Sequence, residues 1–215
     1  YAMGANATNS SVLGVWRSDD GGANWTQRTT SSGIQSGGCS NASGGGSQMW
    51  YDAGLTVDPN NPETVLLSGV DLYRSINGGT TFQDITCGYG NGNVHVDHHA
   101  RAFLPNAFGG YDANKLLSGS DGGVFYTANA QFGTGGSTTS NRPTFISLNQ
   151  TIGSIELYSG DITAGFATAA NPGASAGAQD NGSEYARWPS GNQEPVQWTV
   201  RNGGDGIYTR IEPVN

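Results

Sequence analysis

Short runs of β-branched and aromatic residues, separated by turn-forming residues, dominate the apolar pattern of the chain. These runs predict strands at residues 55–58, 64–69, 72–75, 94–100, 102–105, 115–119, 123–127, 144–148, 197–200 and 207–212. Gly, Asn, Asp and Pro lie between them, and these residues favour turns. No run keeps the 3.6-residue period of a helix beyond one or two turns. The pattern therefore predicts an all-β protein.

The strand pattern repeats along the chain. Residues 12–27 and 65–85 each contain an apolar run, then Arg-Ser, then a Gly-Gly turn and an aromatic residue, and two looser copies follow. The closing aromatics recur at intervals of 57, 63 and 53 residues: Trp25, Phe82, Phe145 and Trp198. This interval fits a four-stranded blade of a β-propeller with long loops. We expect one propeller segment over 1–215, with repeats at 1–57, 58–114, 115–170 and 171–215.

Two of the turns share a spaced motif. It reads Ser-x-Asp-x-Gly-x-x-Trp in the first repeat and Ser-x-Asn-x-Gly-x-x-Phe in the second, at Ser18, Asp20, Gly22 and Trp25 and at Ser75, Asn77, Gly79 and Phe82. The spacing resembles the Asp-box, or BNR repeat, a hairpin turn at the periphery of β-propeller blades. The resemblance implies that these residues build turns, with the aromatic packed between sheets, and that they are not an active site.

Longer phrases extend this resemblance over nearly the whole chain. They are LTVDPNNPETVLLSG, VHVDHHARAFLP, SGSDGGVFYT, GAQDNGS and NGGDGIYTRIEP. Together they are similar to large secreted bacterial propellers of the sortilin-like kind, which are related in fold to the family 74 xyloglucanases. The resemblance implies seven or more blades, of which about four are visible here. We therefore expect a processed or partial product, with the remaining blades of the same parent as a partner.

Charge and cysteine content narrow the location and the partners. Nine basic residues face seventeen acidic ones, and Lys115 is the one lysine, so the clustered basic surface that binds nucleic acid is not expected. No apolar run approaches the 20 or so residues of a transmembrane helix. Cys39 and Cys87 lie in Gly-rich turns, which favours a disulfide in an oxidising compartment. We expect an extracellular or cell-surface protein.

All three histidines fall within residues 95–99. If this segment is a strand, His95, Asp97 and His99 share one face, because side chains alternate along a strand. Two imidazoles and a carboxylate can bind a divalent transition metal. The alternative is a hydrogen-bonded polar strand, and no other cofactor is expected.

Asp-Gly phrases supply the candidate carboxylates. Asp121, Asp180 and Asp205 each follow a strand in successive repeats. In a propeller they would converge at one mouth of the central channel, where a carboxylate pair can catalyse hydrolysis of a glycosidic bond. The alternative is that each aspartate organises its own turn.

Aromatic residues beside polar turns are candidates for sugar recognition, because their faces stack on sugars while neighbouring amides and carboxylates form hydrogen bonds. The candidates are Trp50, Tyr51, Tyr89 and Trp188.

Complete catalytic motifs are absent from the sequence: it contains no G-x-S-x-G elbow, P-loop, H-E-x-x-H or zinc-type cysteine cluster. The leading hypothesis is a secreted binding or assembly module for polysaccharides or extracellular proteins. One alternative is an endo-acting, xyloglucanase-like glycoside hydrolase that uses a carboxylate pair. Another is a structural subunit of an extracellular filament or surface layer.

Overall fold

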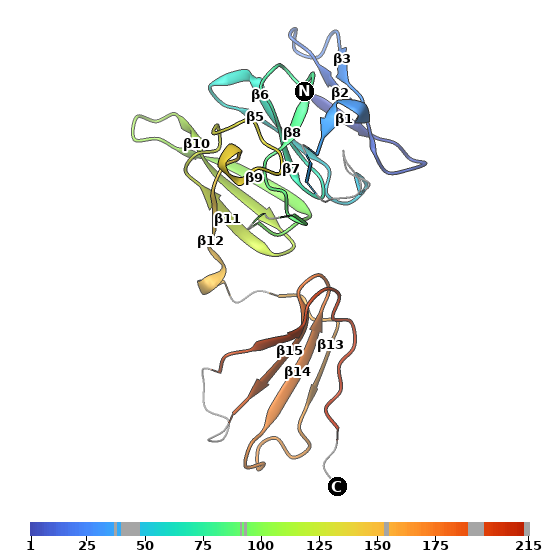
Figure 1. Cartoon of the computed structure of the whole chain (residues 1–215), viewed down its shortest axis with the longest axis vertical. Coiled ribbons are helices and arrows are strands. Elements are labelled where there is room, and N and C mark those ends of the chain that lie inside the picture. The colour runs from blue at the N-terminus through green and yellow to red at the C-terminus, as the bar shows by residue number, and fades with distance from the viewer. Residues whose placement is uncertain are drawn as a thin grey trace. The chain divides into compact units, whose positions relative to one another are not determined.

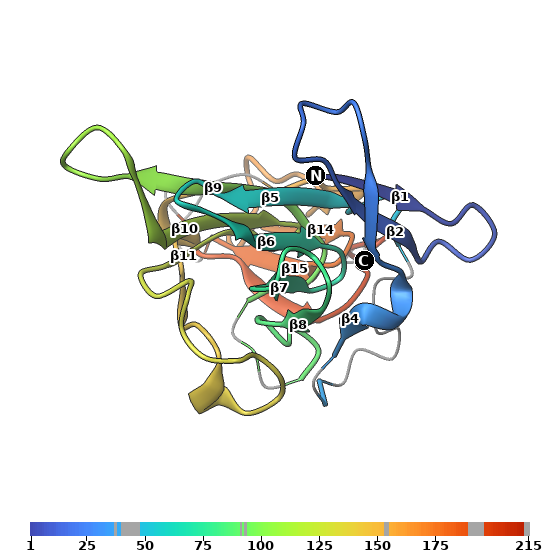
Figure 2. The same cartoon turned by 90° about the horizontal axis from the view of Figure 1, so that it is seen from above.

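The computed structural model describes residues 1–36, 38–39, 48–90, 92, 94–152, 155–188 and 196–212. These residues form four β-sheets and three short 3-10 helices, at Ser31–Gly33, Thr139–Asn141 and Asn149–Thr151 (Figures 1 and 2). The all-β prediction is therefore confirmed. The chain divides into two compact units, Tyr1–Ile152 and Gly153–Asn215. Within the described ranges, no helix has the length and apolar character needed to cross a membrane.

The first unit contains three sheets. One has the order β1-β2-β3: Ala2–Ala5, Val12–Arg17 and Thr26–Thr29. The next has the order β4-β8-β7-β6-β5, with β4 Ile34–Gln35, β5 Gly54–Asp58, β6 Asn61–Ser68, β7 Leu72–Ser75 and β8 Phe82–Asp84. The last has the order β12-β11-β10-β9, with β9 His98–Pro105, β10 Tyr111–Ser120, β11 Gly123–Thr127 and β12 Phe145–Ser147. Only the short β4–β8 pair is parallel among the described strands, and none of the three sheets closes on itself.

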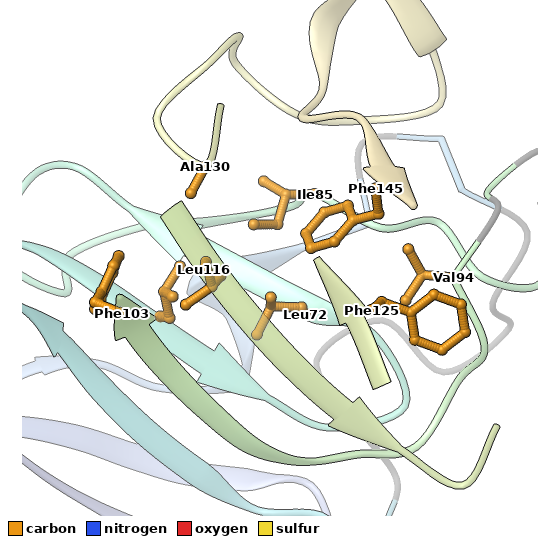
Figure 3. Close-up of a cluster of buried hydrophobic side chains, with 9 residues drawn as sticks. Leu72, Ile85, Val94, Phe103, Leu116, Phe125, Ala130 and Phe145 are labelled. Carbon is orange, nitrogen blue, oxygen red and sulfur yellow. The ribbon is translucent and has the colours of Figure 1, made fainter. Parts of the chain in front are cut away.

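Strand β6 is buried on both faces, which explains its uninterrupted apolar sequence. Val65 and Leu67 belong to a cluster shared with β1 and β2, whereas Leu66 belongs to a cluster shared with β9, β10 and β11. Side chains alternate between the faces of a strand, so β6 contributes to two cores at once. Figure 3 shows Leu72 and Leu116 within the second of these clusters. The five-stranded sheet is therefore packed between the other two sheets of the unit.

The second unit is one antiparallel sheet in chain order: β13 Ser159–Ile162, β14 Gly173–Ala178, β15 Gly182–Arg187 and β16 Thr199–Asn202. Its core joins Ala174, Ala186 and Trp188. Strand β14 consists of Gly, Ala and Ser, because the chain near Gly206 lies directly against it. A Cβ on Gly177 would lie 2.3 Å from the Gly206 carbonyl oxygen, a distance that no side chain tolerates.

The observed elements differ from the expected ones in several places. The expected repeat boundaries at 57/58 and 114/115 fall inside β5 and β10, and the boundary at 170/171 separates the paired strands β13 and β14. Residues 94–97 and 207–212 are not strands. Asp97 has a φ of 62°, which is incompatible with an extended strand, so β9 begins one residue later at His98.

The two motif turns have equivalent hydrogen bonds. In the β2–β3 turn, the Ser18 hydroxyl donates to Asp20 (2.8 Å) and accepts from the Gly22 N–H (2.8 Å). In the β7–β8 turn, the Ser75 hydroxyl donates to Asn77 (2.9 Å) and accepts from the Gly79 N–H (2.9 Å). The Asp or Asn then accepts from the backbone N–H four residues later, at 2.9 Å and 3.0 Å. The same side-chain bonds therefore close both turns.

The aromatic residues of the two turns have different surroundings. Phe82 is fully buried in the core shared with β2. Trp25, which we expected to pack between sheets, is 48% exposed and donates its indole N–H to the Gly22 carbonyl at 3.0 Å. Trp25 is therefore not enclosed between two of the described sheets, and β3, the strand that follows it, is an edge strand.

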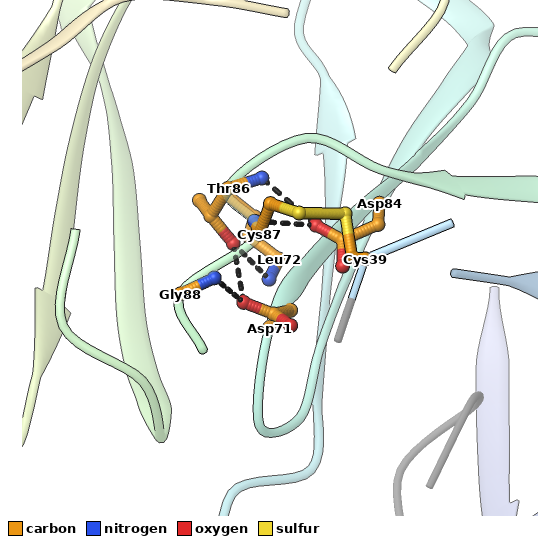
Figure 4. The surroundings of a disulfide bond; sticks show 7 residues. All are labelled: Cys39, Asp71, Leu72, Asp84, Thr86, Cys87 and Gly88. Carbon is orange, nitrogen blue, oxygen red and sulfur yellow. Dashed lines mark hydrogen bonds between the residues drawn. A yellow bond between two sulfur atoms is a disulfide. The ribbon is translucent and has the colours of Figure 1, made fainter. Parts of the chain in front are cut away.

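A disulfide joins Cys39 to Cys87, as the sequence predicted, with 5.3 Å between the two Cα atoms (Figure 4). It closes a loop of 48 residues, and in the chain-entropy description such a loop stabilises the fold by about 4 kcal/mol. Two buried carboxylates line it. Asp84 accepts the N–H groups of Thr86 (2.9 Å) and Cys87 (2.8 Å), and Asp71 accepts the N–H of Gly88 at 2.6 Å.

The loss of stability on replacing the motif serine should depend on whether its turn is buried. Ser75→Ala leaves the buried Gly79 N–H without an acceptor, so we expect a loss of about 1–3 kcal/mol in the free energy of unfolding. Ser18→Ala breaks the equivalent bond at an exposed Gly22, where water replaces the hydroxyl, and should cost less than about 1 kcal/mol. Urea unfolding of both variants measures the difference. Equal losses would contradict this account.

Burial next to Asp71 raises the pKa of Asp84. A raised pKa means that the stability associated with this group is fully present below the unfolded value of about 4 and is lost as the pH rises through the folded value. Asp84→Asn keeps an oxygen for the two N–H donors and removes the charge. At pH 8.5 we expect the melting temperature of the variant to exceed that of the parent. The difference should be about 2–4 °C for each kcal/mol that burial of the ionised Asp84 carboxylate costs the parent. Melting curves from pH 4 to 9 test this, and a constant difference would contradict it.

Candidate functional site

A tight turn at residues 48–52 directs two aromatic side chains outward and one carboxylate inward. The N–H groups of Tyr51 and Asp52 both donate to the Gln48 carbonyl, at 2.8 Å and 3.2 Å. Trp50 is 73% exposed and Tyr51 is 47% exposed, whereas Asp52 is 1% exposed. The turn thus presents two aromatic side chains to solvent and buries one carboxylate.

Side chains of this turn reach the start of β9 and the β10–β11 turn. The Gln48 amide donates to Asp97 Oδ1 at 2.8 Å, and the Tyr51 hydroxyl lies 3.3 Å from both carboxylate oxygens of Asp121. Asp121 is also bound by His99, with 2.7 Å between Nε2 and Oδ1. Because a carboxylate only accepts hydrogen bonds, the proton of this pair is assigned to Nε2. We refer to Asp97, His99 and Asp121 as the carboxylate cluster.

The aromatic rings of the turn continue onto the cluster. The Trp50 and Tyr51 ring centroids are 5.5 Å apart, and the edge-on contact of Tyr51 with His99 has a centroid distance of 4.7 Å. Contacts of this geometry hold the rings in place. The result is an exposed aromatic surface, formed by Trp50 and Tyr51, that ends at the Asp121 carboxylate.

The carboxylate cluster concentrates negative charge in a desolvated place. An oxygen of Asp97 lies within 4.8 Å of an oxygen of Asp121. Asp97 is 5% exposed as a residue, and the side chain of Asp121 is 15% exposed. Neither carboxylate oxygen of Asp52 has a hydrogen-bond partner. Burial, followed by the charge of Asp97, raises the pKa of Asp52 to about 7, while His99 acts in the opposite direction.

The expected metal ligands are only partly brought together. The ligand atoms of His95, Asp97 and His99 do not all lie within 4.8 Å of one another, so the structure does not bring this set of three described residues together at one point. Strand alternation does not hold across Asp97, and the His95 ring lies 3.1 Å from the Val96 carbonyl. His98 points into the core, where burial lowers its pKa to about 3. The structure places Asp121 beside Asp97 instead.

The three candidate catalytic aspartates are divided between the two units of the chain. Asp121, in the first unit, contacts residues well beyond its own turn. Asp180 and Asp205 belong to the second unit, where the Asp180 N–H donates to Asp205 Oδ1 at 3.1 Å and Asp180 has a φ of 58°. Asp205 therefore accepts a backbone N–H of the β14–β15 turn, which is not the turn that contains Asp205 itself.

The candidate binding aromatics separate into exposed and buried residues. Trp50, Tyr51 and Tyr89 are exposed. Trp188 is 9% exposed, so its ring does not face solvent. It packs edge-on against Phe166, with 5.1 Å between centroids, and forms the core of the second unit.

A groove on the second unit was not expected from the sequence. It has a volume of about 900 Å³, and its basic and aromatic lining consists of Tyr185, Arg187, Arg201, Tyr208 and Arg210. Arg201 lies 5.6 Å from the Tyr185 ring centre and Arg210 lies 5.1 Å from that of Tyr208. Tyr185 and Arg187 alternate onto one face of β15, and the contact of Arg201 with the Tyr185 ring places Arg201 on the same side. The pattern Tyr-x-Arg occurs at 185–187 and again at 208–210, and this repetition is the sequence feature from which the groove lining could have been predicted.

No protein-family model, no curated protein and no solved structure matches the chain.

Proposed function

We propose that the chain is an extracellular polysaccharide-binding module built from β-propeller blades. The observation that carries this proposal is the exposed pair Trp50 and Tyr51 ending at the Asp121 carboxylate. Aromatic faces cover the apolar side of a sugar ring, and a carboxylate accepts hydrogen bonds from its hydroxyl groups. The Cys39–Cys87 disulfide supports an oxidising, extracellular location.

The packing of the sheets supports the propeller. Blades of a propeller stack face to face, and the five-stranded sheet of the first unit is buried on both faces. The paired turns at Ser18 and Ser75 support the proposed relation to Asp-box repeats, because one hydrogen-bond pattern recurs in two sheets. Further blades would then come from the same parent chain.

Binding is favoured over glycoside hydrolysis. A retaining glycosidase places two carboxyl groups about 5–5.5 Å apart, and Asp97 and Asp121 approach this spacing. However, Asp97 and Asp52 are buried, and Asp121 is bound by His99 and Tyr51. A sugar can reach the aromatic surface without displacing these groups, whereas a catalytic pair would have to be exposed first.

The groove of the second unit favours acidic sugars. Three of the nine basic residues of an acidic chain line it: Arg187, Arg201 and Arg210. Guanidinium groups bind carboxylate or sulfate groups with charge-assisted hydrogen bonds, and the adjacent tyrosine rings supply stacking surface. A polymer that contains uronic acid or sulfated units fits this surface better than a neutral one.

Loss of the aromatic surface should weaken glycan binding. We expect Trp50→Ala and Tyr51→Ala each to reduce affinity for a bound polysaccharide about tenfold or more, measured by calorimetry after a panel has identified a ligand. Phe108→Ala is the control, because Phe108 is 95% exposed on the hairpin between β9 and β10, which projects from its sheet (Figure 2). Equal losses in all three variants would indicate nonspecific adhesion and contradict the site.

Binding of an acidic and of a neutral polymer should distinguish the groove of the second unit from the aromatic surface formed by Trp50 and Tyr51. We expect Arg201→Ala to reduce binding of a uronic acid polymer about tenfold and to leave a neutral polymer unaffected. Arg28→Ala, which removes a cation of the first unit, is the control and should not discriminate between the polymers. Affinity electrophoresis in gels with each polymer measures the effect. Equal retardation of the parent by both polymers would contradict a preference for acidic sugars.

A further inference from the structure

Asparagine followed by glycine is a chemically reactive sequence. The backbone nitrogen of the glycine can attack the side-chain carbonyl carbon of the asparagine, because glycine has no side chain to shield that nitrogen and its backbone turns easily. The attack requires a glycine N–H and an asparagine amide that other groups do not hold. Asn-Gly occurs three times with both residues in the described ranges, at residues 77–78, 181–182 and 202–203.

Two of these asparagines are restrained by hydrogen bonds. The Gly78 N–H is buried and donates to the Glu63 carbonyl at 2.9 Å. The carboxamide oxygen of Asn77 accepts the Thr81 N–H at 3.0 Å. The side-chain amide of Asn181 donates to the backbone carbonyl two residues earlier, at 3.1 Å. These bonds hold the reacting atoms in place and oppose the attack.

The corresponding groups of Asn202 and Gly203 are not restrained. Asn202 is the exposed last residue of β16, and its side-chain amide forms no hydrogen bond with the described residues. Among those residues the Gly203 N–H has no acceptor either. No atom beyond the chain neighbours lies within 4 Å of the position that a Cβ on Gly203 would occupy. The backbone nitrogen is therefore open to its own asparagine side chain.

We propose that Asn202 is a site of spontaneous deamidation. The Gly203 nitrogen forms a bond to Asn202 Cγ, the bond from Cγ to the amide nitrogen breaks, and the proton of the Gly203 N–H leaves with that nitrogen as ammonia. The product is a cyclic succinimide. Water then opens the ring at either carbonyl carbon and leaves aspartate or isoaspartate, without oxidation or reduction of any group.

The reaction places a negative charge in the groove of the second unit. Asn202 lines this groove together with Arg187 and Arg201. A carboxylate at this position competes with an acidic ligand for the guanidinium groups. We therefore expect the affinity of the groove for acidic polymers to decline as the protein ages. This consequence rests on the proposed function, whereas the deamidation does not.

Peptide mapping of the full chain by mass spectrometry tests the modification. After incubation at pH 8.5 and 37 °C, we expect the amide of Asn202 to be replaced by a carboxyl group about tenfold faster than that of Asn77, which corresponds to a barrier lower by about 1.4 kcal/mol. An isoaspartate fraction at residue 202 is expected, because direct hydrolysis of the side chain produces aspartate alone. Equal rates at Asn77 and Asn202, or an unmodified Asn202, would overturn the proposal.

Gly203→Ala is the matched control variant. Its methyl group meets no other part of the structure, and Gly203 does not have a positive φ, so we expect the fold and the groove to be retained. The methyl group shields the attacking nitrogen and should slow deamidation of Asn202 about tenfold. Deamidation of the variant at the parent rate would overturn the proposed route through the Gly203 nitrogen.

Affinity electrophoresis in a gel that contains a uronic acid polymer tests the consequence for binding. Retardation of the parent should decrease with the fraction of Asn202 that has reacted, and equally aged Gly203→Ala should keep its retardation. Deamidation of the parent with unchanged retardation would contradict the proposed role of the groove and would leave the modification site established.

Discussion

The first unit depends on the burial of both faces of strand β6. Val65 and Leu67 are directed to one neighbouring sheet and Leu66 to the other, so neither core is complete without this strand. Removing apolar surface from water on two sides stabilises more than a one-sided sheet of the same length. The constraint also fixes register, because a slip of one residue would exchange the side chains of the two cores.

The turn at residues 48–52, whose Gln48 and Tyr51 side chains contact the carboxylate cluster, is attached to this packing. Asp52 follows Met49, which is buried in the core shared with β6, and precedes β5. The backbone of this turn is therefore anchored on both sides, and the Asp52 side chain is held in a buried position. Tyr51, the preceding residue, keeps its ring exposed beside His99. This short segment therefore contains a core residue, a buried carboxylate and an exposed aromatic ring.

Sequence patterns located the strands rich in Val, Leu and Phe, because those residues are found mainly where a pleated surface is buried. They did not locate β14, where Ala and Gly replace them to admit the chain at Gly206. The pattern predicted that residues 94–100 form one strand. The positive φ of Asp97 interrupts the extended backbone, so side chains do not alternate regularly across this residue. Contacts such as Tyr51 with Asp121, 70 residues apart, arise from sheet packing and have no local signal.

The tryptophan residues give the two units distinct optical properties. Trp188 is surrounded by Phe166 and Trp198 in an apolar core, whereas Trp50 lies in water beside Tyr51. Indole emission moves to shorter wavelength as the ring leaves water. Trp188 therefore contributes blue emission that is lost when the core of the second unit opens. Trp50 contributes red emission from the proposed binding surface, on top of that from Trp25 and Trp198, which are 48% and 40% exposed. Intrinsic fluorescence can follow the folding of one unit and the occupancy of the other in the same sample.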